Sequence, residues 1–219
     1  MSVEEPTASD QAPEVVPAGD GGLAEIPPNP DYPARMNVDY PAKSSRLLIF
    51  VRWLTTIPHW IALFGLGIGA FFAFVWAWFV VLFTAKYPQG VFDYVVGVIR
   101  WAQRVMAYQL FMTDEYPPFS LEDDPSYPVR VEVQAPPEMH IARWRALLQG
   151  IMAYPAAIAA GGLFIVAYLG VIGAWFAILF TGRYPKGIFR FVTVTLRWSL
   201  RVTVYQYLMT ERYPPFVMA

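Results

Sequence analysis

The chain has 219 residues, of which 56% are hydrophobic, only 15% are charged and none is cysteine. Soluble domains average about 45–50% apolar and about 25% charged residues, so this composition indicates an integral membrane protein. The lack of cysteine excludes disulfides, thiol catalysis and thiolate metal sites.

The charges are divided between two parts of the chain. Residues 1–34 carry seven acidic residues and no Lys or Arg, whereas residues 35–219 carry all 16 basic residues and ten acidic ones. Segment 1–31 is rich in proline and poor in apolar residues, so we predict that it is disordered. It lacks the basic and apolar stretches of a secretory signal. We interpret it as a solubilising tail or, alternatively, as an acidic arm that docks on a basic surface.

The rest of the chain is a duplication. Residues 46–119 align without a gap on residues 143–216, and 31 of the 74 positions are identical. A Lys/Arg-Tyr-Pro motif, an Arg-Trp pair and a closing Tyr-Pro-Pro-Phe motif occur once in each copy. These patterns predict four parts: an acidic tail (1–31), a first membrane repeat (32–119), a linker with an extended segment (120–142) and a second membrane repeat (143–216).

A short extended segment precedes each apolar run. Residues 32–38 and 127–133 both begin with Tyr-Pro, and the second segment alternates apolar and polar residues as a strand does. We predict that the two segments pair into a short two-stranded ribbon outside the bilayer, on the cytoplasmic side.

Each repeat then contains an apolar run that is too long for one upright span. A helix from residue 46 to residue 84 would measure roughly 55–60 Å, whereas a hydrocarbon core is about 30 Å thick. Glycines near the middle of each run suit a tight turn, because glycine accepts positive φ. We therefore predict two transmembrane hairpins, with helices at about 45–64 and 67–85, and at about 142–160 and 163–182. The alternative is one long kinked span per repeat, with residues 46–57 on the membrane surface.

The hairpin arrangement also predicts the topology. Apart from Arg52, every Lys and Arg would lie on one side of the membrane, and the turns on the other side carry none. Because Lys and Arg are retained on the cytoplasmic face, we expect a multi-pass protein with both termini in the cytoplasm.

A basic amphipathic helix follows each apolar run, at about 88–113 and 185–210. Arginines recur on one face of it, and apolar residues cover the others, as in a helix that lies at a membrane interface. Two interpretations are open: the arginines bind anionic lipid headgroups or an acidic partner, or they only anchor the helix. The candidate surface consists of Lys86, Arg100, Arg104, Arg183, Arg197 and Arg201.

Two ionisable residues interrupt the first apolar run. Arg52 is close enough to the end of the run for its side chain to reach the membrane surface, and His59 lies deeper. An ionisable residue within a membrane segment is a candidate functional site. The second copy has neither residue, so a function that depends on this candidate intramembrane site would belong to the first repeat alone.

The motifs Phe83-Thr84-Ala85-Lys86-Tyr87-Pro88, Arg100-Trp101 and Tyr116-Pro117-Pro118-Phe119, with their second copies, resemble a bacterial membrane family known as domain of unknown function 4389. The resemblance covers about residues 31–216. It implies a protein of the bacterial inner (plasma) membrane. It implies no activity, because the family supplies no catalytic residues to transfer.

The sequence favours a non-enzymatic role. It has no phosphate-binding glycine loop, no metal-spaced histidine cluster and no nucleophile motif, so we expect no catalysis, no cofactor and no metal. We expect an all-α membrane scaffold or accessory subunit, which binds membrane lipids and either a membrane protein partner or a second copy of itself, and no nucleic acid. The alternative is a small transporter or channel component that acts as an oligomer.

Overall fold

The computed structural model describes residues 32–215. The predicted disordered segment 1–31 lies outside the described residues. The elements, in chain order, are β1 (Ala34–Val38), α1 (Leu48–Thr84), α2 (Gln89–Gln109), β2 (Val129–Val133), the short 3-10 helix η1 (Pro137–Met139), α3 (Arg143–Thr181) and α4 (Lys186–Gln206). The protein is therefore mostly helical, with one small sheet.

The predicted hairpin turns are wrong, because each apolar run forms one continuous helix. Helix α1 has 37 residues and α3 has 39, and both pass through the glycines where we expected a turn. Gly65, Gly67, Gly161 and Gly162 all lie inside these helices. Glycine permits a turn but does not impose one, and an unbroken helix satisfies the backbone groups of an apolar segment internally. The continuity agrees with the single helix per repeat of the alternative, whereas the membrane span and the surface position of residues 46–57 stay predictions.

Helices α2 and α4 are shorter than the ranges 88–113 and 185–210. Both end in the same Schellman motif, in which Phe111 (φ 63°) and Leu208 (φ 58°) adopt left-handed conformations. The amide of Met112 donates to the carbonyl of Ala107 at 3.0 Å, and that of Met209 donates to Val204 at 3.1 Å. These bonds satisfy carbonyls in the last turn and end both helices at equivalent residues.

The predicted pairing of the two extended segments into a ribbon is confirmed, whereas its place outside the bilayer stays a prediction. Strands β1 and β2 pair antiparallel, with Met36 opposite Val131 at the centre and Ala34 opposite Val133 at one end. The amide of Asp39 donates to Pro128, and the amide of Gln134 donates to Pro33, so the pairing extends equally at both ends. The ribbon is symmetric, and its centre lies on a pseudo-twofold axis that relates the two repeats.

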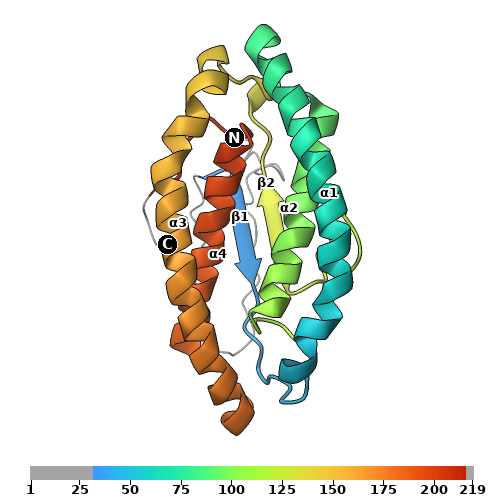
Figure 1. The fold of residues 1–219 in the computed structure, drawn as a ribbon, viewed down its shortest axis with the longest axis vertical. Coiled ribbons are helices and arrows are strands. Elements are labelled where there is room, and N and C mark those ends of the chain that lie inside the picture. The colour runs from blue at the N-terminus through green and yellow to red at the C-terminus, as the bar shows by residue number, and fades with distance from the viewer. Residues whose placement is uncertain (1–31, 216–219) are drawn as a thin grey trace, which may run out of the picture.

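The two repeats surround this axis in three layers. In the first half, α1 packs on α2 and α2 packs on β2. In the second half, α3 packs on α4 and α4 packs on β1. Figure 1 looks along the axis: α1 and α3 run antiparallel on the two sides, and the ribbon lies between α2 and α4. The core between these layers includes Ala77, Val81, Tyr87, Ala174, Ile178 and Tyr184, all of them buried.

Each repeat closes the end of the other. The amide of Ile141, just before α3, donates to Ala85 at the end of α1. The equivalent amide of Ser44, just before α1, donates to the carbonyl of Gly182 at the end of α3. Both hydrogen bonds measure 3.0 Å. Because of these exchanged contacts, α1 and α3 meet at both ends of the molecule, which we call its poles.

The continuous helix predicts the effect of glycine substitutions. A methyl group added at Gly65 meets no atom within 4 Å, whereas one added at Gly97 would lie 2.8 Å from the Cβ of Leu121. We expect Gly65→Ala to raise the free energy of unfolding by about 0.5–1 kcal/mol, because alanine favours a helix. Gly97→Ala should lower the free energy of unfolding, because the added methyl group would overlap Leu121. Denaturant titration in detergent micelles measures both, and a destabilised Gly65→Ala variant would argue for a turn at this position.

Candidate functional site

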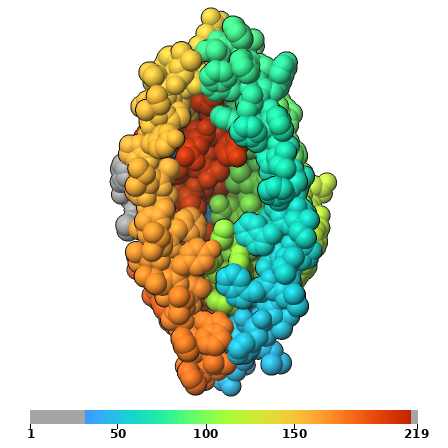
Figure 2. Space-filling view, in the orientation of Figure 1, coloured from blue at the N-terminus to red at the C-terminus, as the bar shows by residue number. Residues whose placement is uncertain are grey.

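The outer face of the molecule is apolar. Helices α1 and α3 are each long and apolar enough to cross a membrane, and only 17% and 22% of the most apolar windows are buried inside the protein. This low burial separates them from core helices of soluble proteins. Figure 2 shows this face, on which the two long helices frame a hollow with α4 and α2 at its floor.

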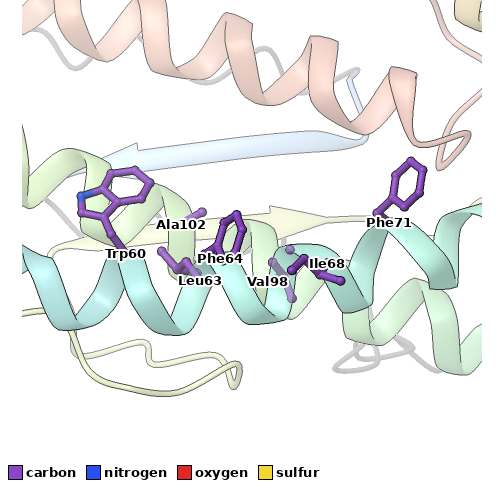
Figure 3. Close-up of a pocket in the computed structure, with 8 residues that line it drawn as sticks. Trp60, Leu63, Phe64, Ile68, Phe71, Val98 and Ala102 are labelled. Carbon is purple, nitrogen blue, oxygen red and sulfur yellow. The ribbon is translucent and has the colours of Figure 1, made fainter.

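The hollow contains an apolar depression of about 700 Å³ beside α1. Figure 3 shows Trp60, Phe64 and Phe71 projecting from the same side of α1. Val98 and Ala102 of α2 line the depression as well. All of its lining residues are apolar, so the depression offers an apolar surface.

The Arg52 side chain does not extend outward, as the sequence suggested, but is fully buried against the end of α2. Its Nη1 atom donates to the carbonyl of Tyr108 at 2.6 Å and to that of Thr113 at 2.7 Å. The Nη2 atom forms an ion pair with Asp114. Arg52 thus supplies donors to carbonyls at the end of a helix, where the helix itself has none.

The second repeat performs the same task with a neutral side chain. Gln149 occupies the position of Arg52, and its Nε2 atom donates to the carbonyls of Tyr205 and Thr210 at 2.7 and 2.8 Å. These residues are the equivalents of Tyr108 and Thr113. Sequence reasoning missed Gln149, although its alignment with Arg52 was a usable signal.

A carboxylate beside each of these side chains holds the start of a long helix. Asp114 accepts a hydrogen bond from the amide of Ser45, and Glu211 accepts one from the amide of Ala142, both at 2.6 Å. Both carboxylates lie near the first turn of α1 or α3, where a negative charge is stabilised by the helix dipole. Arg52 and its partners therefore form a structural cluster.

Four arginines of the candidate surface point inward to the ribbon and its flanking loops. The Nε atom of Arg100 donates to the carbonyl of Val131 in β2 at 3.2 Å, and that of Arg197 donates to Met36 in β1 at 2.8 Å. Each strand of a two-stranded sheet has one unpaired edge, and these bonds satisfy a carbonyl on each of them. Arg100 and Arg197 thus connect α2 and α4 to the ribbon.

The other two arginines stack on tyrosines. The guanidinium of Arg104 lies 5.8 Å from the ring centre of Tyr127, and that of Arg201 lies 5.7 Å from the ring centre of Tyr32. Burial lowers the pKa of both arginines and raises the pKa of both tyrosines. The position of each guanidinium over a ring makes each contact a cation–π pair.

The predicted common basic surface is therefore not formed. Arg104, Arg197 and Arg201 are buried, and Arg100 is mostly covered and pairs with Asp123 at 3.4 Å. Lys86 and Arg183 are exposed, but they follow α1 and α3 and lie at opposite poles. The helical periodicity placed the arginines on one face correctly, but it could not reveal that the ribbon and loops cover that face.

His59 is buried between α1 and the Tyr-Pro-Pro-Phe motif. The Nε1 atom of Trp101 donates to its Nδ1 atom at 3.1 Å, and its ring stacks on that of Phe119 with centres 3.9 Å apart. In the second repeat, Ala156 takes this position and packs against Trp198. His59 therefore packs α2 and the Tyr-Pro-Pro-Phe motif against α1.

The shared role of Arg52 and Gln149 gives a matched mutational test. Arg52→Leu leaves two buried carbonyls without donors, so we expect it to lower the free energy of unfolding by roughly 2–4 kcal/mol. Arg52→Gln should cost less than half of that, because glutamine makes these bonds in the second repeat. Unfolding titrations of both variants, with Gln149→Leu as the counterpart, measure the difference. Equal losses for Arg52→Gln and Arg52→Leu would contradict the shared role.

The arginine bonds to the ribbon are tested by amide hydrogen exchange. We expect Arg197→Met to speed exchange in β1 at least tenfold, because a hydrogen bond from a charged donor contributes about 1.5–3 kcal/mol. Arg190→Met, on the exposed side of the same helix, is the control and should leave exchange in β1 unchanged. Equal exchange in the two variants would show that Arg197 does not hold the strand.

The sequence was also compared with known proteins. No curated protein and no solved structure matches the chain. A family model described as "Domain of unknown function (DUF4389)" matches residues 46–120 and 143–218. The two matches follow the two repeats and together cover more than half of the sequence. The chain therefore belongs to the DUF4389 family and carries two copies of its domain in tandem.

Proposed function

We propose that this protein is a non-enzymatic scaffold or accessory subunit of the bacterial inner (plasma) membrane. The observation that carries the proposal is the distribution of its side chains. Large apolar residues are exposed along α1 and α3, whereas the arginines of α2 and α4 are turned inward to backbone carbonyls and aromatic rings. A protein built in this way uses its charges to hold its shape and offers hydrocarbon surface to its surroundings.

The depression beside α1 favours a scaffold over the transporter or channel alternative. A coupled-ion or substrate path needs polar groups, yet aromatic and aliphatic side chains line this space. Arg52 and His59, the ionisable residues of α1, contact protein groups and do not line the depression.

Anionic lipid headgroups are the proposed ligands of the exposed cations at the poles. Lys86 and Arg143 lie near one pole, and Lys43, Arg46 and Arg183 lie near the other, all of them exposed. Each cation near an anionic surface contributes about 1 kcal/mol to binding. Both termini are proposed to be cytoplasmic, on the side of the ribbon. The predicted second crossing of each repeat loses its support, because it depended on the hairpin turns.

A membrane protein partner or a second copy of the chain is the proposed protein ligand. Halfway along the long helices, Gly65, Gly161 and Gly162 are exposed, and an added Cβ at any of them would meet nothing within 4 Å. Small residues allow another helix to approach closely within a membrane.

Purification in a gentle detergent tests this function. We expect the tagged protein to retain a stable membrane protein partner or to form a homo-oligomer, and to carry anionic lipid. A Lys86→Gln, Arg183→Gln double variant should lose part of the anionic lipid, because two headgroup contacts are removed, but keep the protein partner. Mass spectrometry of the purified complex measures both components.

Two results would contradict the scaffold proposal. One is a monomer that purifies without any partner and conducts ions in liposomes, which would favour the channel alternative. The other is a chain that stays soluble without detergent and does not bind vesicles, which would remove the membrane itself from the proposal.

A further inference from the structure

An exposed apolar stripe runs along almost the entire length of both long helices. On α1 it consists of Phe50, Ile61, Phe72 and Phe83, which are 58–71% exposed. The equivalent residues of α3 are Leu147, Ile158, Leu169 and Phe180, which are 58–75% exposed. Their spacing of 11 residues corresponds to about three helical turns, so each set lies along one line.

The stripe is too long for an upright helix in a bilayer. From Phe50 to Phe83 it covers about 50 Å at 1.5 Å per residue, and the whole of α1 covers about 55 Å. To fit 55 Å into a hydrocarbon core of about 30 Å, the helix would have to tilt by about 55°, beyond the usual range of 0–40°. An upright placement would leave both ends of each stripe in water.

The ribbon gives an independent argument against an upright placement. Its central pair, Met36 and Val131, lies on the pseudo-twofold axis, and Figure 1 shows the ribbon halfway between the poles and parallel to the long helices. Asp39 and Arg130 form an ion pair at 2.8 Å with side chains 51% and 38% exposed. If α1 crossed the membrane, these charges would lie within the hydrocarbon core, where exposed charges and open strand edges are strongly disfavoured.

The positions of the exposed cations also argue against an upright placement of the long helices. Lys43 and Arg183 lie at one pole, and Lys86 and Arg143 at the other. Crossing helices would place similar positive charge on both sides of the membrane, against the retention of Lys and Arg on the cytoplasmic side. If the long axis lies in the membrane plane, all four cations reach the headgroups of one leaflet.

We propose that α1 and α3 lie in the plane of the membrane, inserted into the cytoplasmic leaflet only. The occupants of the apolar face and of its central hollow are the acyl chains of that leaflet, and the ribbon faces the cytoplasm. This placement rests on the membrane association proposed above and makes the protein monotopic rather than membrane-spanning.

The depth of single fluorophores in liposomes tests this placement. The chain has no cysteine, so single cysteines at Phe50, Ile61, Phe72 and Phe83 can each carry a fluorophore. Quenching by lipids brominated at different acyl positions should report the same depth for all four labels. A label at the exposed Glu132 of β2 is the control and should not be quenched. Deep labels at Ile61 and Phe72 with shallow ones at Phe50 and Phe83 would show a crossing helix and overturn the proposal.

Sidedness provides a second measurement. Lys43→Cys and Lys86→Cys lie at opposite ends of α1, and both should react with an impermeant maleimide from the cytoplasmic side only. Labelling from opposite sides overturns the in-plane placement but leaves the scaffold proposal intact. A protein that does not float with the vesicles contradicts the membrane association itself. If a substitution on α1 prevents folding, the equivalent residues Leu147, Ile158, Leu169 and Phe180 give the same depth comparison.

Discussion

The need to satisfy backbone carbonyls at the ends of α2 and α4 determines much of this structure. These helices end inside the protein, where water is not available to the last carbonyls. Arg52 and Gln149 supply the missing donors from α1 and α3, and the neighbouring Asp114 and Glu211 bind the amides at which the long helices begin. One cluster in each repeat therefore fixes the end of one helix and the start of another.

The tandem arrangement follows from contacts that neither repeat can make alone. One strand precedes each long helix, and the two strands form backbone hydrogen bonds with each other across the pseudo-twofold axis. Each repeat also supplies the segment that closes the long helix of the other, through the amides of Ile141 and Ser44. A single copy would leave a strand edge and a helix end open, so the duplication completes the fold rather than repeating a finished unit.

The same contacts separate the two surfaces of the molecule. Arginines of α2 and α4 point inward to the ribbon and loops, and the exposed side of α1 and α3 consists mainly of apolar residues. The charged ribbon and the apolar stripes face opposite sides of a flat body. This separation is the physical basis for the membrane role and the in-plane placement that we propose for this DUF4389 protein.

The sequence by itself determined the duplication, the apolar character of residues 46–84 and their copy, the arginine-bearing face of α2 and α4, and the ribbon. These are local patterns, and period, composition and proline position report them directly. Only the tertiary structure decided that Gly65 lies in a continuous helix, because glycine tolerates a turn without requiring one. Only the structure showed that Arg104 and Arg201 are buried. A helical period says which residues share a face, but the partner that covers this face comes from segments such as 127–133, which are distant in sequence.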